Sequence, residues 1–313
     1  MQKYRICFVG LGSIARRHIK NTAIVLESRN IGYEIDVLRS GNGNPIDPET
    51  ESRISTVYYD INDINGEYDA VFITNPTQKH AETLKAFSGK AKAFFIEKPV
   101  FHTSEIDISE LGIEEGVIYY VACPLRYNQV IRYVKANIDP KDVLGIRAIS
   151  SSYLPDWRPG TDYRKTYSAI KELGGGVSID LIHEWDYITY LIGMPNKVHS
   201  FIKKVSDLEI NSDDIAVYIA EYDDKIVELH LDYFTKKAVR ELRIMLNGET
   251  VTADIINGTV TYEVSGNKVD LNEDRDAYQI KEIEYFFDLI EKETLNENDL
   301  FNAYSVLRIA EGK

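Results

Sequence analysis

The chain has 313 residues and a formal charge of −14, and its 27% charged and 44% apolar side chains are ordinary proportions for a globular protein. This length exceeds the usual size of a single domain and predicts two domains, each able to bury a core. The negative charge argues against nucleic acid or an anionic membrane as the main partner, because both select a basic protein face.

The beginning of the chain predicts a nucleotide-binding turn. A β-prone run, Tyr4–Val9, leads into Gly10-Leu11-Gly12-Ser13-Ile14-Ala15 and then into a helix through about Val25. In this strand–turn–helix pattern Gly10 permits the tight turn, and Gly12 lets a pyrophosphate approach the backbone. The helix start supplies free N–H groups and a partial positive charge. The expected phosphate contacts are Gly10, Gly12, Ser13 and Ile14.

The second strand, Tyr33–Leu38, runs into Arg39 and Ser40. An NAD site usually carries Asp or Glu at this edge, where the carboxylate accepts the ribose 2′-hydroxyl. Arginine and serine instead suit the 2′-phosphate of NADP, so we expect NADP(H), with NAD as the alternative. In that alternative Arg39 is a solvated loop residue and Asp36 is the acid, although Asp36 lies inside the strand and not at its tip.

Two further strands carry the remaining cofactor candidates. Tyr68–Thr74 runs into a Thr-Asn-Pro-Thr turn and a helix, His80–Phe87, while Ala93–Ile96 delivers Glu97-Lys98-Pro99 and Val117–Ala122 closes the set. This alternation predicts a doubly wound parallel sheet over residues 1–122. Such sheets bind cofactors at the carboxyl ends of their strands. The expected contacts there are Thr74, Asn75, Pro76, His80, Glu97 and Lys98.

Lys98 is also a catalytic candidate. A lysine at a loop tip is usually a solvated charge. Here it ends a buried strand, precedes a φ-restricting proline, and lies at the sheet edge where a nicotinamide belongs. This placement favours the catalytic interpretation.

The second predicted domain, residues 123–313, begins with a helix from Leu125 to about Ile138, followed by a strand over Val143–Tyr153. Arg126 either contacts the substrate or forms an ion pair between the domains. Residues 153–168 then form an unusual loop, whose Pro, Gly and Asp residues argue against regular structure. Aromatic rings that stack on sugars or bases alternate there with guanidinium groups that bind anions. The expected substrate contacts are Arg126, Trp157, Arg158, Tyr163 and Tyr167, unless the loop instead packs on a neighbouring subunit.

A glycine-rich stretch, Gly174–Gly176, precedes a predicted amphipathic helix that ends at Gly193. Apolar residues fall on one face of this helix. Polar residues, among them Asp180 and His183, fall on another. Taken alone, the polar stripe is typical of a solvent-exposed helix face. With the nucleotide-binding motifs, it predicts that Asp180 and His183 are catalytic.

The remainder of the chain predicts an antiparallel sheet and two closing helices. The strands are expected at Lys197–Lys203, Ile215–Tyr222, Ile226–Tyr233, Val239–Asn247, Thr250–Asp254 and Thr259–Glu263. Helices are expected at Tyr278–Lys292 and Asp299–Ala310. One face of this meandering sheet should pack on helices, while the other is available to a second subunit.

In this order the motifs resemble the glucose-fructose oxidoreductase / inositol dehydrogenase / MocA (Gfo/Idh/MocA) family. The resemblance rests on GxGxxA after the first strand, Thr-Asn-Pro-Thr with His80, Glu97-Lys98-Pro99, and the triple glycine leading to Asp180 and His183. By position, Lys98 matches the family lysine that touches nicotinamide and the substrate hydroxyl, and Asp180 and His183 match its acid and histidine. The usual spacing is Asp-x-x-x-His; here it is one residue shorter, which leaves open which of the two contacts the reacting hydroxyl.

The resemblance implies a Rossmann domain followed by an α/β domain with a large, mostly antiparallel open sheet used in homodimers or homotetramers. It also implies hydride transfer between NADP or NAD and a sugar or sugar derivative, and the aromatic and arginine loop favours an acidic or nucleotide-linked one. The form of the glycine stretch is similar to a subgroup associated with bacterial surface-sugar biosynthesis. Two alternatives keep the fold: a glycoside hydrolase that uses NAD for transient oxidation, and a non-catalytic nucleotide or sugar sensor.

The two cysteines, Cys7 and Cys123, lie far apart and show no metal-ligand spacing. We therefore expect no metal site and buried free thiols in a reducing cytoplasm. The first apolar run is short and broken by glycines, and no run has the length of a membrane-spanning helix, so neither a signal peptide nor a membrane segment is expected.

Overall fold

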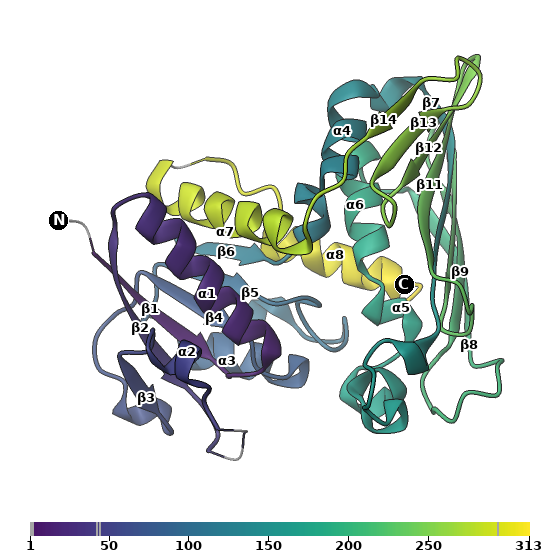
Figure 1. Ribbon diagram of the computed structural model, residues 1–313. Coiled ribbons are helices and arrows are strands. Elements are labelled where there is room, and N and C mark those ends of the chain that lie inside the picture. Colours follow the sequence, from purple (N-terminus) through teal and green to yellow (C-terminus); the bar gives the residue numbers. More distant parts are fainter. Residues whose placement is uncertain (1–2, 42, 44, 293) are drawn as a thin grey trace. The chain divides into compact units, whose positions relative to one another are not determined.

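The computed structural model describes residues 3–41, 43, 45–292 and 294–313 (Figure 1). The chain forms two compact units. The first consists of the residues up to Ala122 together with Gln279–Tyr304, and the second of Cys123–Tyr278 together with Ser305–Lys313. Two helices, α7 (Arg275–Lys292) and α8 (Leu300–Ala310), contribute residues to both units. Among the described residues, no helix is both long and apolar enough to cross a membrane.

The first unit contains a six-stranded, wholly parallel sheet in the order β3-β2-β1-β4-β5-β6. This order is that of a doubly wound nucleotide-binding fold and confirms the predicted fold class. The strands are β1 (Lys3–Val9), β2 (Gly32–Leu38), β3 (Thr56–Tyr58), β4 (Ala70–Ile73), β5 (Ala93–Ile96) and β6 (Ile118–Val121). The helices between them are α1 (Ser13–Ser28), α2 (Pro48–Glu51) and α3 (His80–Ala86).

The core of the first unit is built on aromatic rings of adjacent strands. Phe72 of β4 and Phe95 of β5 stack with their ring centroids 4.8 Å apart. His18 of α1 lies 5.0 Å from the Phe95 ring, and Phe286 of α7 lies 5.3 Å from it. Helices α1 and α7 therefore cover the same face of the sheet. Offset and edge-to-face contacts of this kind add to the free energy gained from burial.

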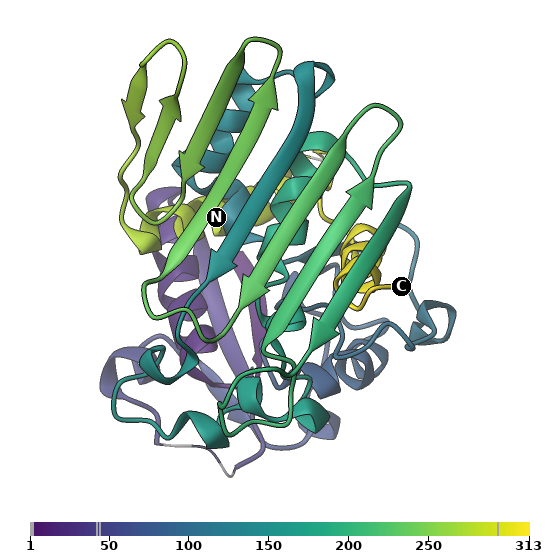
Figure 2. The ribbon, with the colours of Figure 1, turned by 90° about the vertical axis from the view of Figure 1, so that its right-hand side faces the viewer.

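The second unit contains an eight-stranded sheet in the order β14-β13-β12-β11-β7-β10-β9-β8 (Figure 2). It is mostly antiparallel, as predicted, but it is not a simple meander, because β7 lies between β11 and β10 and runs parallel to β10. Since most of its residues are buried, a central position suits β7. The strands are β7 (Val143–Ser151), β8 (Lys197–Lys203), β9 (Ile215–Glu221), β10 (Ile226–Asp232), β11 (Val239–Leu246), β12 (Glu249–Asp254), β13 (Thr259–Tyr262) and β14 (Lys268–Asp270).

The helices α4 (Gln129–Asn137), α5 (Val177–Asp180) and α6 (His183–Ile192) belong to the second unit and lie behind its sheet in Figure 2. Trp185 of α6 packs edge-on against Tyr218 of β9, with 5.4 Å between ring centroids. On the opposite sheet face Phe201 is 62% and Ile219 42% exposed. Strand pairing aligns Phe201 with Val217, two residues before Ile219, so these apolar side chains share that face.

The prediction of a single helix after the glycine stretch is wrong. The chain leaves the helix at Leu181, whose ψ angle is 30°, and a new helix begins at His183. Asp180 thus ends one helix and His183 starts the next, so the argument that both share one helical face does not hold. Nor is α6 a surface helix, because Glu184, Trp185 and Tyr187 are completely buried.

Candidate active site

The glycine-rich turn of the first unit is shaped by close backbone contacts. Gly10 has a φ of +92° and donates its N–H to the carbonyl of Leu38 at 2.8 Å. A Cβ on Gly10 would lie 2.7 Å from the Cα of Asn75, so only glycine fits. In contrast, a Cβ on Gly12 would meet nothing within 4 Å.

Gly12 is also the N-cap of the 16-residue helix α1, whose first turn has neither a side-chain cap nor an acidic residue. Gly12 thus lies in open space at a helix N-terminus, where the backbone N–H groups favour anions. These features fit the pyrophosphate of a dinucleotide.

The acid and the base weighed from the sequence at the end of β2, Asp36 and Arg39, lie in different settings. Asp36 is 4% exposed, accepts the Tyr68 hydroxyl at 2.8 Å, and lies 3.4 Å from the Arg5 guanidinium. It is therefore engaged inside the first unit. Arg39 follows the strand, is half-buried, and donates its N–H to the carbonyl of Tyr58 at 3.0 Å, while Ser40 is exposed.

The turn after β4 is held by polar side chains. Thr74 donates its hydroxyl to the carbonyl of Val9 at 3.0 Å, which ties this turn to the end of β1. His80 is completely buried, with its ring nitrogens 3.1 Å from the carbonyl oxygens of Asn75 and Val100. Burial lowers the pKa of His80, and a neutral imidazole donates from one nitrogen only. Being fully buried, His80 can act on a cofactor only through the backbone that it supports.

Glu97 and Lys98 directly follow β5, the strand that pairs with β4. One Glu97 oxygen lies 2.5 Å from His18 Nε2, and the other accepts the Lys98 N–H at 3.2 Å. Burial raises the pKa of Glu97, but the hydrogen bond and charge of His18 outweigh this and hold it below its usual range. His18, which sequence reasoning missed, thus anchors the acid beside Lys98. Lys98 itself is half-buried, and its peptide bond to Pro99 is cis.

In the second unit, the buried Asp180 is the centre of a polar cluster. Tyr167 donates its hydroxyl to one carboxylate oxygen of Asp180, and Tyr233 donates to the other at 2.6 Å. Asp213 lies nearby and accepts the Ser178 N–H at 2.9 Å. Burial and then the charge of Asp180 raise the pKa of Asp213. Neither Tyr233 nor Asp213 was identified from the sequence.

The glycine stretch lets the backbone pack closely against other residues of this cluster. A Cβ on Gly175 would lie 2.1 Å from the carbonyl oxygen of Tyr167. A Cβ on Gly176 would lie 2.2 Å from a carboxylate oxygen of Asp213. The glycines therefore let the loop that carries Tyr167, and also Asp213, approach the backbone closely.

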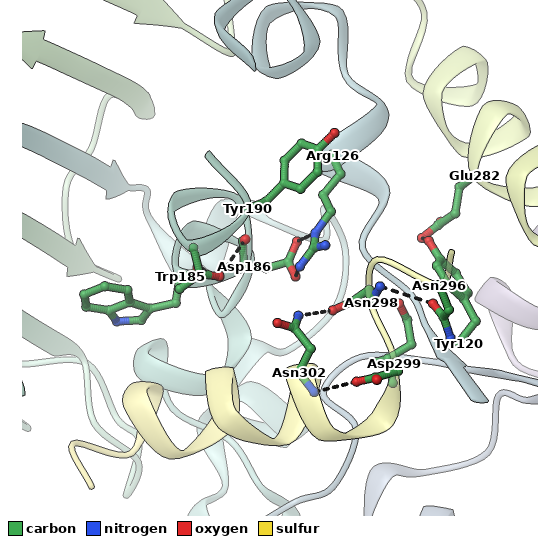
Figure 3. A network of polar contacts seen from close by, with 12 residues as sticks. Tyr120, Arg126, Trp185, Asp186, Tyr190, Glu282, Asn296, Asn298, Asp299 and Asn302 are labelled. Carbon is green, nitrogen blue, oxygen red and sulfur yellow. Dashed lines mark hydrogen bonds and ion pairs between the residues drawn. The ribbon is translucent and has the colours of Figure 1, made fainter. Parts of the chain in front are cut away.

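Helix α6 carries two buried acids, each paired with an arginine. Asp186 accepts two hydrogen bonds from Arg126, at 3.0 and 2.7 Å, and the Tyr190 ring lies 4.9 Å from the same guanidinium (Figure 3). Glu184 accepts from Arg240 at 2.7 Å. Both Arg126 and Asp186 belong to the second unit, so this pair is internal to it. His183, the first residue of α6, is half-buried.

The loop over residues 153–168 contains short 3₁₀ turns, although its Pro, Gly and Asp residues predict no regular structure. Trp157 is 36% exposed, donates to the Ser152 hydroxyl, and packs edge-on against Tyr233. A pocket is lined by Leu154, Pro155, Trp157, Arg158, Thr161, Tyr163, Thr166 and Ser168. Three of the expected substrate residues therefore line one pocket.

Two family models match the chain, one within each compact unit. Residues 4–122 match an oxidoreductase family with an NAD-binding Rossmann fold, and residues 131–254 match the Gfo/Idh/MocA C-terminal domain. The chain belongs to the Gfo/Idh/MocA family. The resemblance drawn from the motifs is thereby confirmed, and with it membership of an NAD-binding oxidoreductase family.

This Gfo/Idh/MocA chain matches curated relatives from Bacillus subtilis (strain 168). The uncharacterized oxidoreductase YrbE is 24% identical over 188 residues, which are 59% of this chain and 52% of the relative. A scyllo-inositol 2-dehydrogenase (NAD(+)) is 27% identical over 194 residues, 60% of this chain and 54% of the relative. The matched region spans about half the length of these relatives.

Solved structures resemble the chain over nearly its full length. UDP-N-acetylglucosamine 3-dehydrogenase from Acidithiobacillus ferrooxidans has a TM-score of 0.77 and 20% identity, with 99% of this chain and 96% of that chain covered. Levoglucosan dehydrogenase in complex with NADH and levoglucosan has a TM-score of 0.84, 15% identity and the same coverage. At these identities the likeness establishes the fold.

Proposed function

We propose that this chain is an NAD(P)-dependent sugar dehydrogenase or ketoreductase. The observation that carries the proposal is the arrangement of the first sheet. Its order β2-β1-β4-β5 brings Gly10, Thr74 and Lys98 to one edge, at the carboxyl ends of successive strands. A nucleotide-binding turn and a lysine that follows a carboxylate held by His18 thus share the edge at which such folds bind dinucleotides.

The residues that would hold the dinucleotide are Gly10, Gly12, Ser13, Ile14, Arg39, Ser40, Thr74, Asn75, Pro76, Glu97 and Lys98, with His80 acting through its hold on Asn75. When bound, the nicotinamide supplies the hydride acceptor or donor. An arginine at the end of β2, with Asp36 already engaged by Tyr68, supports NADP(H) over NAD(H).

The catalytic side chains we assign are Lys98, His183 and Asp180. In the oxidative direction His183 takes the proton of the substrate hydroxyl, and Lys98 hydrogen-bonds the same oxygen and stabilises its negative charge. Asp180 orients or tunes the histidine. General acid–base catalysis of this kind contributes about 10²–10⁴ in rate.

For the substrate we propose an acidic or nucleotide-linked sugar, contacted by side chains of the loop over residues 153–168. Trp157 and Tyr163 offer aromatic faces there, and the exposed Arg158 offers an anion-binding group. Two structural neighbours are named for a UDP-linked sugar and for levoglucosan, which supports a sugar in general. Arg126 we assign to holding Asp186 and thereby α6, since its guanidinium is buried and bound on two nitrogens.

The test starts from wild-type protein. Mass spectrometry identifies any nucleotide that it releases. Absorbance of the reduced nicotinamide at about 340 nm then follows turnover with free, acidic and nucleotide-linked sugars. Absence of net nucleotide-dependent oxidation or reduction with every sugar would refute the proposal, and sugar release without net reduction would favour the hydrolase alternative.

Variants then test the roles. Lys98→Ala and His183→Ala should each lower kcat by roughly 10²–10⁴ while nucleotide binding persists. Matched controls are Lys92→Ala and His199→Ala, whose side chains pair with Asp69 and Glu221 outside the proposed site. Wild-type turnover in both test variants would contradict the assignment.

A further inference from the structure

The Asp180 carboxylate is held by two tyrosines from distant parts of the second unit. Tyr167, in the loop, donates its hydroxyl to Oδ1, and Tyr233, directly after β10, donates to Oδ2 at 2.6 Å. Asp180 is 4% exposed and Tyr233 is completely buried. Each oxygen of the proposed catalytic acid therefore accepts a hydrogen bond from a tyrosine hydroxyl.

Both hydroxyls keep their protons at neutral pH. Burial, and then the negative charge of Asp180, raises the pKa of Tyr167 and Tyr233 well above the usual range. Hydrogen bonds donated to a carboxylate favour its ionised form. With a hydroxyl donating to each of its oxygens, the Asp180 carboxylate is held from both sides.

The donors and the acid are also fixed in place. The Tyr233 backbone donates to the carbonyl of Asp214 at 3.0 Å and accepts the Leu154 N–H at 2.9 Å. Asp213 binds the N–H groups of Val177 and Ser178, at the start of the short helix that ends in Asp180. The Trp157 ring lies edge-on to Tyr233, 5.2 Å away between centroids. The cluster thus joins the loop pocket to Asp180 by direct contacts.

We propose that Tyr167 and Tyr233 are positioning residues that hold the Asp180 side chain in one orientation, and that His183 takes the substrate proton. This inference rests on the proposed function and assigns the role that the shortened Asp–His spacing left open. Neither tyrosine needs to touch the substrate. Their hydroxyls act through Asp180, so the loss of either should slow turnover without weakening nucleotide binding.

A double-mutant cycle tests this role. Tyr167→Phe and Tyr233→Phe each remove one hydroxyl and keep the ring, and each is also combined with Asp180→Asn. The control is Tyr218→Phe, because Tyr218 is as completely buried as Tyr233 but donates to the carbonyl of Ala310 at 2.6 Å. The measurements are kcat, KM, the nucleotide dissociation constant and the temperature of unfolding, with a substrate found in the absorbance screen.

Each Tyr→Phe change should lower kcat by roughly 10- to 100-fold, the range for losing a hydrogen bond to a charged group, with nucleotide affinity unchanged. In the Asp180→Asn background the same change should lower kcat by less than about twofold, because residues that act as one unit are not additive. Tyr218→Phe should keep wild-type kcat.

Wild-type kcat in both single Tyr→Phe variants, or losses that multiply with that of Asp180→Asn, would overturn the inference while leaving the proposed function intact. The inference would also be overturned if the Tyr→Phe variants lowered only the unfolding temperature and kept wild-type kcat. If the wild-type chain turns over no sugar with either nucleotide, the proposed function fails and this inference fails with it.

Discussion

Replacing Arg126 with methionine separates a structural from a substrate-binding role for this side chain. Arg126 is 5% and Asp186 7% exposed, and the two are joined by hydrogen bonds of 3.0 and 2.7 Å. Methionine preserves much of the volume but leaves the Asp186 carboxylate buried without its counter-charge. Removing one member of a buried ion pair typically costs about 3–5 kcal/mol.

That loss is large enough to measure by thermal unfolding. For proteins of roughly 150–250 residues, each kcal/mol lowers the unfolding temperature by about 2–4 °C. We therefore expect Arg126→Met to unfold about 6–20 °C below wild type. Calorimetry or circular dichroism gives the temperature, and steady-state kinetics on the same preparation give KM.

Two matched variants sharpen the result. Arg126→Met with Asp186→Leu removes both charges, so it should unfold at a higher temperature than Arg126→Met alone. Arg147→Met removes an exposed arginine that pairs with Glu228 at 3.1 Å, and it should cost less than about 1 kcal/mol. An unchanged unfolding temperature in Arg126→Met, together with a KM for the substrate raised about tenfold (roughly 1.4 kcal/mol), would refute the structural role. It would instead support a substrate-binding role for Arg126.

Three further predictions concern cofactor, substrate and assembly. Arg39→Asp should raise KM for NADPH about tenfold and spare NADH, since it removes the cation for the 2′-phosphate; equal effects on both would contradict the NADP preference. Arg158→Ala should raise KM for an acidic sugar about tenfold and leave KM for the nucleotide unchanged. Arg164→Ala should leave both KM values unchanged, because the Arg164 guanidinium is already held by Asp162 and Glu209. Phe201→Glu should dissociate an oligomer formed through the open sheet face, as judged by light scattering; a wild-type monomer would exclude that interface.

The fold was predictable because its signals are local. The bounds of β5 and β8 agree with the sequence prediction, since each strand is a short run with turn residues at its ends. The edge strands β3 and β14 were missed. Each has three residues and at least one exposed position, which is too short for a period-two pattern to stand out.

The break between α5 and α6 shows where periodicity fails. The spacing of apolar residues across Val177–Ile192 fits one helix, yet the chain leaves helical geometry at Leu181. Asp213 fixes the start of α5 through two backbone N–H groups, and the buried pairs of Glu184 and Asp186 fix α6. Tertiary contacts of this kind outweigh local helix preference, and they come from residues outside the window that periodicity examines.

Some residues of the candidate site were predictable from sequence motifs, and others are brought to it only by the fold. Gly10, Gly12 and Lys98 lie in motifs whose chemistry is readable from neighbouring residues. Tyr233, in contrast, lies 53 residues from Asp180 and belongs to no motif, so only the fold reveals that it binds the acid. A single sequence does not show that Tyr233 lies within hydrogen-bonding distance of Asp180.

His18 is the one missed residue that the sequence did signal. It shares the buried face of α1 with Ala15, Thr22 and Leu26, at helical spacing. An ionisable side chain on such a face needs a buried partner. Of the residues that directly follow β1, β4 and β5, which are Gly10, Thr74 and Glu97, only Glu97 is an acid. Helical spacing and strand order therefore suffice to pair the buried histidine of the first helix with the acid that adjoins Lys98.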